Sequence, residues 1–247
     1  MQKVYLILGA SSDLGNALMR RLINVENTGE LVFIAHYHSN CSQIDEIISE
    51  YPEQDIRPIQ ADLSDMESVH NLIEHIQTME IQPTHIVNLC ANTFHHTRLS
   101  EWDYNIINKD MTIQVYAFAE VLKAFVPVMA KNHYGKIVVM LTAYTIGTPP
   151  KNMSGYVTVK YALMGLMKSI ASDYGDQGIN INGVSPGMIN TKFISGIGRK
   201  IKEFTAESNP KHRNLETGDV VPTICLLLSD EAEYISGSNI NLSGKTD

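Results

Sequence analysis

The stretch VYLILGASSDLG, residues 4–15, is the strongest indication of the fold in this sequence. Its first five residues are apolar, which is typical of a strand buried on both faces, and the small residues from Gly9 onward form a turn that leads into a helix at Asp13. Small residues let the backbone approach a phosphate, and the N-terminus of the following helix stabilises the negative charge. Because an ordinary tight turn has the same composition, the motif gains its weight from its place in the first strand–helix unit.

Asp13 is the unusual residue of this turn. We expect it to begin the helix, where its carboxylate interacts favourably with the helix dipole. It also stands where a glycine would allow closer approach, and its charge does not help to bind a phosphate. The residues of the turn that we expect to contact an anionic cofactor are Gly9, Ser11, Ser12, Asp13, Leu14 and Gly15.

Short apolar runs alternate with segments of helical periodicity along the rest of the chain, which predicts βαβ units and a parallel sheet in a single α/β domain over residues 1–247. The least regular stretch, about 188–216, is expected to be a mobile substrate lid over the carboxyl ends of the strands. Strands are expected near 3–8, 31–37, 56–60, 84–90, 136–142, 180–184 and 239–242, and helices near 13–24, 42–50, 65–78, 112–131, 155–174 and 219–228.

Composition excludes several kinds of partner. The chain has 19 Lys and Arg against 27 Asp and Glu, a formal net charge of −8, which argues against nucleic acid or an anionic membrane surface. Its three cysteines have no metal-binding or redox spacing, which favours a reduced, cytoplasmic location. No apolar run approaches the roughly 18 residues of a membrane helix. We therefore expect neither a nucleic-acid nor a membrane partner.

Tyr156 and Lys160 form the second decisive motif. On a helix, their four-residue offset places the phenol and the ammonium on one face. A nearby cation lowers the pKa of a phenol from about 10 towards neutral pH, so the pair can protonate a carbonyl oxygen or deprotonate an alcohol. A pair with this spacing also arises by chance in a chain with 11 tyrosines, so its weight depends on the other motifs.

The segment after the second strand, from His36 to Asn40, bears on the choice of dinucleotide. It lacks the acidic residue that NAD-selective sites offer to the ribose, which leaves room for a 2′-phosphate and favours NADP(H) over NAD(H), with His36 as a cofactor contact. The pairs His36/His38 and His95/His96 are not completed by cysteine or carboxylate ligands, so we expect no metal.

Polar residues also follow the later strands. Asp62 is either the N-cap of the next helix or part of an adenosine pocket, and Asn88 is either a turn residue or part of the same pocket. Cys90 is expected to be a buried apolar residue, and Thr142 ends the fifth strand with a hydroxyl that can donate to a substrate oxygen. The further cofactor contacts expected at strand ends are Leu63, Ala91, Pro186, Gly187, Ile189 and Thr191.

Together these motifs resemble the short-chain dehydrogenase/reductase family over essentially the whole chain, with most similarity to 3-oxoacyl-thioester (acyl-carrier-protein) reductases. The resemblance implies a Rossmann-like three-layer sandwich, with helices on both faces of a seven-stranded parallel sheet in the order 3-2-1-4-5-6-7. It also implies a homotetramer or homodimer, and hydride exchange between NAD(P)(H) and a small carbonyl or alcohol substrate. The segments that carry it are Gly9 to Gly15, Asp62-Leu63, Asn88 to Ala91, Gly135 to Thr142, Tyr156 to Lys160, Pro186 to Thr191 and Gly237 to Gly244.

The resemblance also implies roles for single residues. Tyr156 would be the general acid in reduction and the base in oxidation, and Lys160 would lower its pKa and bind the nicotinamide ribose. Thr142 stands where the family has a serine that polarises the substrate carbonyl. Gln114 stands where the family has an asparagine that supports a proton-relay water.

Two functions remain open on the sequence. The intact Tyr156/Lys160 pair favours an NAD(P)H-dependent carbonyl reductase. The departures at Thr142 and Gln114, with Asp13 and Ala91 in place of family glycines, favour a catalytically weak dinucleotide-binding or interaction protein.

Phe94 and Tyr144 suggest a partly apolar pocket. The surplus of apolar residues over one face in 112–131 and 155–174 belongs either to the core or to a subunit interface. The lid residues Lys192, Arg199, Lys200 and Lys202 form either a solvated basic face, which we favour, or a site for an anionic substrate group.

Overall fold

The computed structural model describes residues 2–26, 31–92, 94 and 98–245. Its centre is a parallel sheet of seven strands in the order β3-β2-β1-β4-β5-β6-β7, which confirms the predicted order. The strand order reverses between β1 and β4, where open parallel sheets bind ligands at the carboxyl ends of their strands. The strands are β1 Lys3–Leu8, β2 Leu31–Tyr37, β3 Asp55–Gln60, β4 His85–Asn88, β5 Gly135–Met140, β6 Ile179–Pro186 and β7 Asn239–Leu242.

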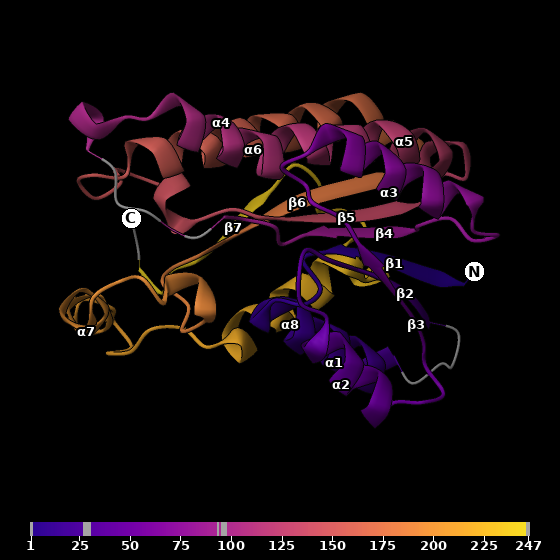
Figure 1. Cartoon of the computed structure of the whole chain (residues 1–247), viewed down its shortest axis with the longest axis horizontal. Helices are drawn as coiled ribbons and strands as arrows, with labels where there is room; N and C mark the ends of the chain where they lie inside the picture. The colour runs from indigo at the N-terminus through magenta and orange to yellow at the C-terminus, as the bar shows by residue number, and fades with distance from the viewer. Residues whose placement is uncertain (1, 27–30, 93, 95–97, 246–247) are drawn as a thin grey trace.

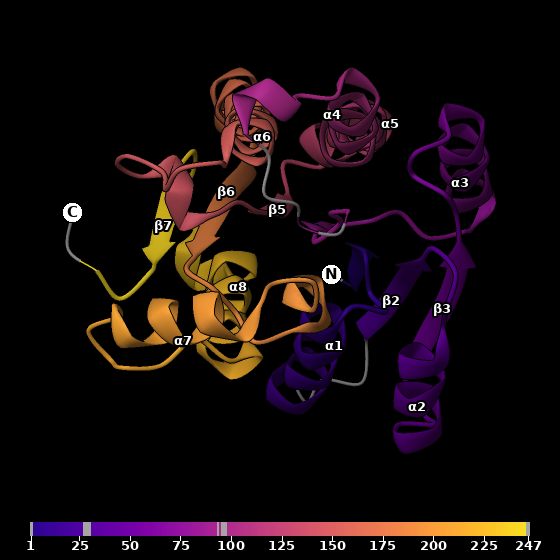
Figure 2. The same cartoon turned by 60° about the vertical axis from the view of Figure 1, so that its left-hand side comes forward.

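Helices cover both faces of the sheet (Figure 1). One layer holds α3 Met66–Thr78, α4 Tyr104–Met111, α5 Ala117–Lys131 and α6 Ser154–Tyr174. The opposite layer holds α1 Asp13–Glu26, α2 Ser42–Glu50 and α8 Thr217–Leu228. The remaining helix, α7 Arg199–Glu207, lies beyond the carboxyl ends of the strands, on the side of the sheet that carries α1 and α8 (Figures 1 and 2).

The continuous apolar run of β1 is explained by burial on both faces. Leu6 and Leu8 belong to the core beneath α5, together with Phe118. Tyr5 and Ile7 point the other way, into the core beneath α1 and α8. All five side chains are fully buried, and burying a side chain of this size stabilises a fold by roughly 1.5–3 kcal/mol. This strand therefore fixes the position of the turn that follows it.

Two helices were not predicted. The helix expected over 112–131 begins earlier, at Tyr104, and runs through a π turn at Thr112–Tyr116. Asp103 caps its start by accepting the N–H of Asn105 at 2.8 Å, a local signal that the apolar pattern did not carry. The second helix, α7, lies inside the 188–216 stretch that was expected to be irregular, where four charged residues within Arg199–Glu203 hide its helical period.

One helical run differs from the expectation that no apolar segment approaches the length of a membrane helix. The continuous helical run Tyr104–Lys131 has the length and apolar composition of a membrane-crossing helix, contrary to the expectation from the sequence. More than half of its apolar window, 56%, is buried inside the fold. Phe118, Val121 and Phe125 pack into the core between α5 and the sheet. We therefore interpret this run as a core helix of the domain.

Candidate active site

The turn after β1 is held in one conformation. Gly9 has a φ of +84°, a left-handed conformation in which a side chain is strained. A Cβ on Gly15 would lie 2.6 Å from the carbonyl oxygens of Gly9 and Ala10, so the start of α1 packs directly on the turn. The Ser12 hydroxyl donates to the Gly9 carbonyl at 2.7 Å and accepts the Gly15 N–H at 3.1 Å. The first N–H groups of a helix have no partner within it, so the start of α1 is suited to an anion.

The buried ring of His36 stabilises this turn by a hydrogen bond. Its ring is 2% exposed, its Nδ1 accepts the Gly9 N–H at 3.1 Å, and its Nε2 donates to the Ala61 carbonyl at 3.1 Å. Burial lowers the pKa of His36 to about 4, so the imidazole is neutral. The expectation that His36 contacts the cofactor therefore needs revision, because both ring nitrogens are bonded inside the protein. The neighbouring His38 is exposed, and its Nε2 lies 3.7 Å from Oδ2 of Asp62.

Asp62 does not cap a helix, so that interpretation was wrong. Its Oδ1 accepts the N–H and the hydroxyl of Ser64, each at 2.8 Å, in a local turn after β3. The N-cap of α3 is Asp65, whose carboxylate accepts the Glu67 N–H at 3.0 Å. Leu63, between these two aspartates, is buried in the core. Asp62 remains at the carboxyl end of β3, within reach of the exposed His38 ring.

Asn88 adopts the turn role that was one of its two interpretations. Its Oδ1 accepts the Cys90 N–H at 3.2 Å, and its Nδ2 donates to the Gln114 carbonyl at 3.4 Å. Cys90 packs at the edge of the core, and loss of solvent raises the pKa of its thiol to about 12. Ala91, the next residue, is partly buried. Cys90 is therefore a structural residue and not a nucleophile.

Lys160 reaches from α6 to the end of β5. Its side chain is 2% exposed, and its Nζ donates to the Met140 carbonyl at 2.7 Å. Burial lowers the pKa of Lys160 to about 8, although the nearby Asp110 carboxylate opposes this shift. The lysine therefore holds a proton that can be exchanged close to neutral pH.

Tyr156 lies one turn earlier on the same helix, with the Lys160 Nζ 5.9 Å from the centre of its ring. Burial raises the pKa of Tyr156 to about 12, and a hydrogen bond with Thr142 opposes the rise. The sequence predicted the opposite direction, from the lysine alone. Burial prevails because the ammonium is bonded to the Met140 carbonyl and because the Phe94 ring packs against the phenol ring.

Thr142 and Gln114 flank this pair. Thr142 follows β5 and is 5% exposed, and its side chain lies close enough to Tyr156 to lower the pKa of the phenol. Gln114 lies in the π turn, which packs against α6, and is 2% exposed. In the part of the chain that the structure describes, its side-chain Oε1 has no hydrogen-bond partner. A buried amide oxygen of this kind is a suitable partner for an ordered water.

The two ends of the 188–216 segment are paired with each other by backbone hydrogen bonds. Ile189 pairs with Leu215, and the N–H groups of Asn190 and Leu215 donate to the carbonyls of Leu215 and Met188 at 2.8 and 2.9 Å. Before it, β6 ends at Pro186, and the Gly187 N–H lies 3.5 Å from the Leu242 carbonyl. A hollow of about 340 Å³ opens between this segment and the turn after β1. Its lining residues are Asp13, Asn190, Thr191, Lys192, Ile194 and Lys202.

Two aromatic side chains, Phe94 and Phe193, form a row of ring contacts that begins at Tyr156 and that the sequence did not reveal. The ring of Phe94 meets the ring of Tyr156 edge to face, with centroids 5.1 Å apart, and Phe193 meets Phe94 at 6.2 Å. Phe94 was predicted to line the pocket, but Phe193 was not named. An aromatic residue two positions after Thr191 was the available signal. The pair His95/His96, at which we expected no metal, lies outside the described residues.

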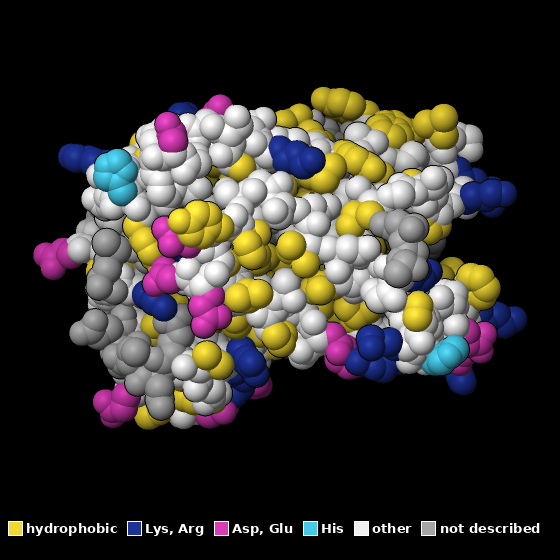
Figure 3. All heavy atoms as spheres, turned by 180° about the vertical axis from the view of Figure 1, so that it is seen from behind, with side chains coloured by type: hydrophobic (Ala, Val, Ile, Leu, Met, Phe, Trp, Pro, Cys, Tyr) yellow, Lys and Arg dark blue, Asp and Glu magenta, His cyan; other side chains and the backbone are white. Residues whose placement is uncertain are grey.

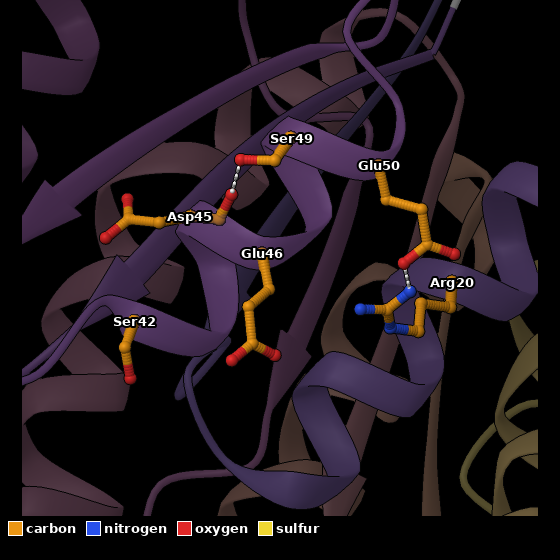
Figure 4. A pocket seen from close by; sticks show the side chains of 6 residues that line it. All are labelled: Arg20, Ser42, Asp45, Glu46, Ser49 and Glu50. Atoms are coloured by element: carbon orange, nitrogen blue, oxygen red, sulfur yellow. Dashed lines mark hydrogen bonds and ion pairs between the residues drawn. The ribbon is translucent and has the colours of Figure 1, made fainter.

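A second hollow, of about 710 Å³, lies between α1 and α2 (Figure 4). It is an open surface depression crossed by an ion pair between Arg20 and Glu50. It contains none of the predicted site residues, so we do not place the active site there. Its lining residues are Arg20, Ser42, Asp45, Glu46, Ser49 and Glu50.

The residues present fit a nicotinamide dinucleotide in most respects. Gly15 has no room for a Cβ, Gly9 has a left-handed φ that strains any side chain, and the start of α1 offers N–H groups to a pyrophosphate. The strand order reverses beside this cradle, and Lys160 reaches the end of β5, with Tyr156 one turn earlier on α6. Asp13 is the poor fit, because its carboxylate repels a phosphate at the same helix start.

A seven-stranded parallel sheet of this order, with a glycine turn after β1 and a Tyr–Lys pair beside β5, defines the class of Rossmann-like oxidoreductases. Residues 9–244 match the family model described as enoyl-(acyl carrier protein) reductase. This match shows that the chain belongs to the short-chain dehydrogenase/reductase family, and it is therefore an oxidoreductase of that family.

Known proteins agree with this assignment over nearly the whole chain. A 3-oxoacyl-[acyl-carrier-protein] reductase of Staphylococcus aureus is 26% identical over 251 residues, which cover 99% of this chain and 98% of the relative. A solved 4-hydroxyisoleucine dehydrogenase complexed with NADH is 25% identical, with a TM-score of 0.85 and coverage of 98% and 97%. A 3-oxoacyl (acyl-carrier-protein) reductase from Agrobacterium tumefaciens with NADP bound is 18% identical, with a TM-score of 0.86 and coverage of 99% and 94%.

Proposed function

We propose that this protein is an NAD(P)H-dependent carbonyl reductase that acts on a 3-oxoacyl-like substrate. The observation that carries the proposal is the buried ammonium of Lys160, which lies 5.9 Å from the centre of the Tyr156 ring, with the Thr142 side chain close enough to the phenol to lower its pKa. A carbonyl oxygen placed between the two hydroxyls can accept a hydrogen bond from each. The staphylococcal relative, a 3-oxoacyl reductase by name, supports the substrate class.

In this proposal the chain's own residues move the proton. Thr142 polarises the carbonyl through its hydroxyl, and Tyr156 transfers its phenolic proton to the carbonyl oxygen as negative charge develops there. The phenolate that remains is stabilised by the Lys160 ammonium, whose pKa of about 8 lets it exchange a proton near neutral pH. The dinucleotide, when bound, supplies the hydride. The turn Gly9–Gly15 and Thr191 would hold its phosphates, and Lys160 its ribose.

We further propose that NADP(H) is preferred to NAD(H). The residues directly after β2, from His38 to Ser42, include no acidic side chain, and the exposed ring of His38 can approach a 2′-phosphate. Asp62 works against this preference, since its carboxylate lies beside the same ring. His38→Asp should therefore shift the binding preference towards NADH, and an unchanged ratio of the two dissociation constants would refute the assignment.

The test of the reaction is turnover of a carbonyl panel that includes 3-oxoacyl thioesters, followed through oxidation of NADPH. Wild-type protein should reduce at least one member, and Tyr156→Phe should abolish turnover while it still binds NADPH. The phenylalanine keeps the ring contact with Phe94, so it is a matched control for packing. Wild-type protein that binds NADPH and reduces nothing would instead support the second candidate, a catalytically weak dinucleotide-binding protein. The carboxylate of Asp13 at the phosphate turn is the observation that favours that candidate.

We propose the 188–216 segment as a substrate lid, since Phe193 extends from it to the aromatic cover of Tyr156. A cytoplasmic location, predicted from cysteine usage, stays a prediction.

We propose that the protein is a homotetramer or homodimer that associates through the α4–α6 layer. Hydrophobic side chains gather along the upper edge of the molecule, where this layer lies (Figure 3). Tyr104 is 71% exposed and Tyr161 is 42% exposed, which is unusual for large apolar rings. A monomer measured by light scattering at micromolar concentration would refute this. The exposed apolar residues of the layer are Tyr104, Ile106, Tyr116, Val128 and Tyr161.

A further inference from the structure

Asp13 joins two parts of the chain that are 179 residues apart. Its Oδ2 accepts the backbone N–H of Lys192 at 2.7 Å, and its Oδ1 accepts the side-chain amide of Gln43 at 3.2 Å. The Lys192 ammonium lies 3.9 Å from Oδ1. The first residue of α1 is therefore bonded to the 188–216 lid.

The backbone hydrogen bond is the stronger part of this contact. An N–H bonded to a carboxylate is a charge-assisted hydrogen bond, and the Asp13 side chain is only 24% exposed. The Lys192 side chain is 81% exposed, and an ion pair with so exposed a partner contributes little. What Asp13 holds is thus the main chain of the lid at Lys192, whichever residue stands there.

This contact reaches the catalytic tyrosine through the next residue. Phe193 follows Lys192 and packs on Phe94, which in turn packs on Tyr156. Fixing the main chain at Lys192 therefore positions Phe193 against Phe94, the residue that packs on Tyr156.

The Asp13 carboxylate also occupies the N-terminus of α1, a position that suits a phosphate. The start of α1 favours one negative charge, and Asp13 supplies it from within the chain. A pyrophosphate bound at the same helix start would meet a like charge, and it would compete for the Lys192 N–H. The hollow lined by Asp13, Thr191 and Lys192 is where the two anions would meet.

We propose that Asp13 is a latch: in the free protein its carboxylate holds the lid, through the Lys192 N–H, against the Phe94 side chain that packs on Tyr156, and dinucleotide binding releases it. The inference rests on the proposed function, because the releasing ligand is the dinucleotide. It follows that a carbonyl substrate reaches Tyr156 after the dinucleotide has bound. Asp13 is accordingly a positioning residue that acts through the lid, and it takes no part in proton transfer.

The first test is hydrogen exchange at the Lys192 amide without any ligand. Asp13→Gly removes the acceptor and should accelerate exchange there about 10- to 100-fold. Asp13→Asn keeps a neutral acceptor and should give a smaller increase. Lys192→Met removes the ammonium but keeps the N–H, so it should change exchange at this position little. Unchanged exchange in Asp13→Gly, with β1 amides still protected, would overturn the latch whatever the protein catalyses.

The second test is titration with NADPH and with NADH, followed by fluorescence. Asp13→Asn should bind the preferred dinucleotide about tenfold or more tightly than wild type, because the competing charge is gone. Lys192→Met should show no such gain. Equal or weaker binding by Asp13→Asn would overturn the release step. If no variant binds either dinucleotide, the proposed function and the release step both fail, and the exchange result alone decides whether Asp13 holds the lid.

Discussion

Nδ1 of His36 accepts the backbone N–H of Gly9 at 3.1 Å, so a buried imidazole in β2 holds the turn that follows β1. The strand register explains this contact, because Leu8 pairs with His36 across the two neighbouring strands. The ring must be neutral at Nδ1 to accept this bond. Protonation of His36 therefore breaks the contact that shapes the phosphate turn.

We predict from this that the free energy of unfolding falls as the pH drops from 6.5 to 4. Burial lowers the pKa of His36 to about 4 and that of His85, stacked on Tyr5, to about 3, whereas both are 6.5 in the unfolded chain. The neutral forms are favoured in the folded protein, so their contribution is complete above pH 6.5 and is lost below it. Each imidazole should contribute a slope of up to about 1.4 kcal/mol per pH unit.

The measurement is urea unfolding at several pH values. His36→Asn keeps an acceptor that does not titrate in this range. It should therefore reduce the slope of the unfolding free energy against pH by the contribution of one imidazole, up to about 1.4 kcal/mol per pH unit. His38→Gln serves as the control, because it replaces an exposed histidine that does not contact the turn after β1. Equal slopes for wild type and His36→Asn would contradict the prediction.

A second prediction concerns Thr142. Thr142→Ser keeps the hydroxyl beside Tyr156 and should retain most of the turnover, whereas Thr142→Val keeps the shape and loses the donor. Removal of one donor to a developing oxyanion costs about 10²- to 10³-fold in kcat, so we expect a loss of that order for the valine variant. Steady-state kinetics with the best substrate of the panel gives the answer. A valine variant as active as the serine variant would exclude Thr142 from the reaction.

Gln114 supports a third prediction, which separates stability from catalysis. Its buried Oε1 lacks a partner among the described residues, and an unsatisfied buried acceptor costs about 1–3 kcal/mol. Gln114→Leu should therefore leave the free energy of unfolding unchanged or higher. If the amide holds a water that relays protons, the same variant should lower kcat while NADPH binding persists. A leucine variant that is less stable and fully active would contradict both parts.

The residues alone predicted the strands well, because burial on both faces leaves continuous apolar runs such as that of β1. The order of the strands in the sheet came from the family resemblance. Helix α7 was missed because its charges hide its period, and α4 because its signal is a cap at Asp103. Contacts between distant segments were out of reach of local patterns, which is why the pKa of Tyr156 was predicted in the wrong direction and the Lys192 contact of Asp13 was not foreseen.

The last prediction compares two glycines that a sequence pattern treats alike. A Cβ on Gly15 would lie 2.6 Å from two backbone oxygens of the turn, which cannot move without disturbing β1 or α1. Gly15→Ala should therefore destabilise the fold by about 1–3 kcal/mol and weaken dinucleotide binding. A Cβ on Gly165, within α6, would meet no atom of the described residues within 4 Å beyond its own helix turn, so Gly165→Ala should stabilise the helix by about 0.5–1 kcal/mol. Thermal unfolding of both variants tests the pair, and a Gly15→Ala protein as stable as Gly165→Ala would mean that the phosphate turn is looser than its geometry indicates.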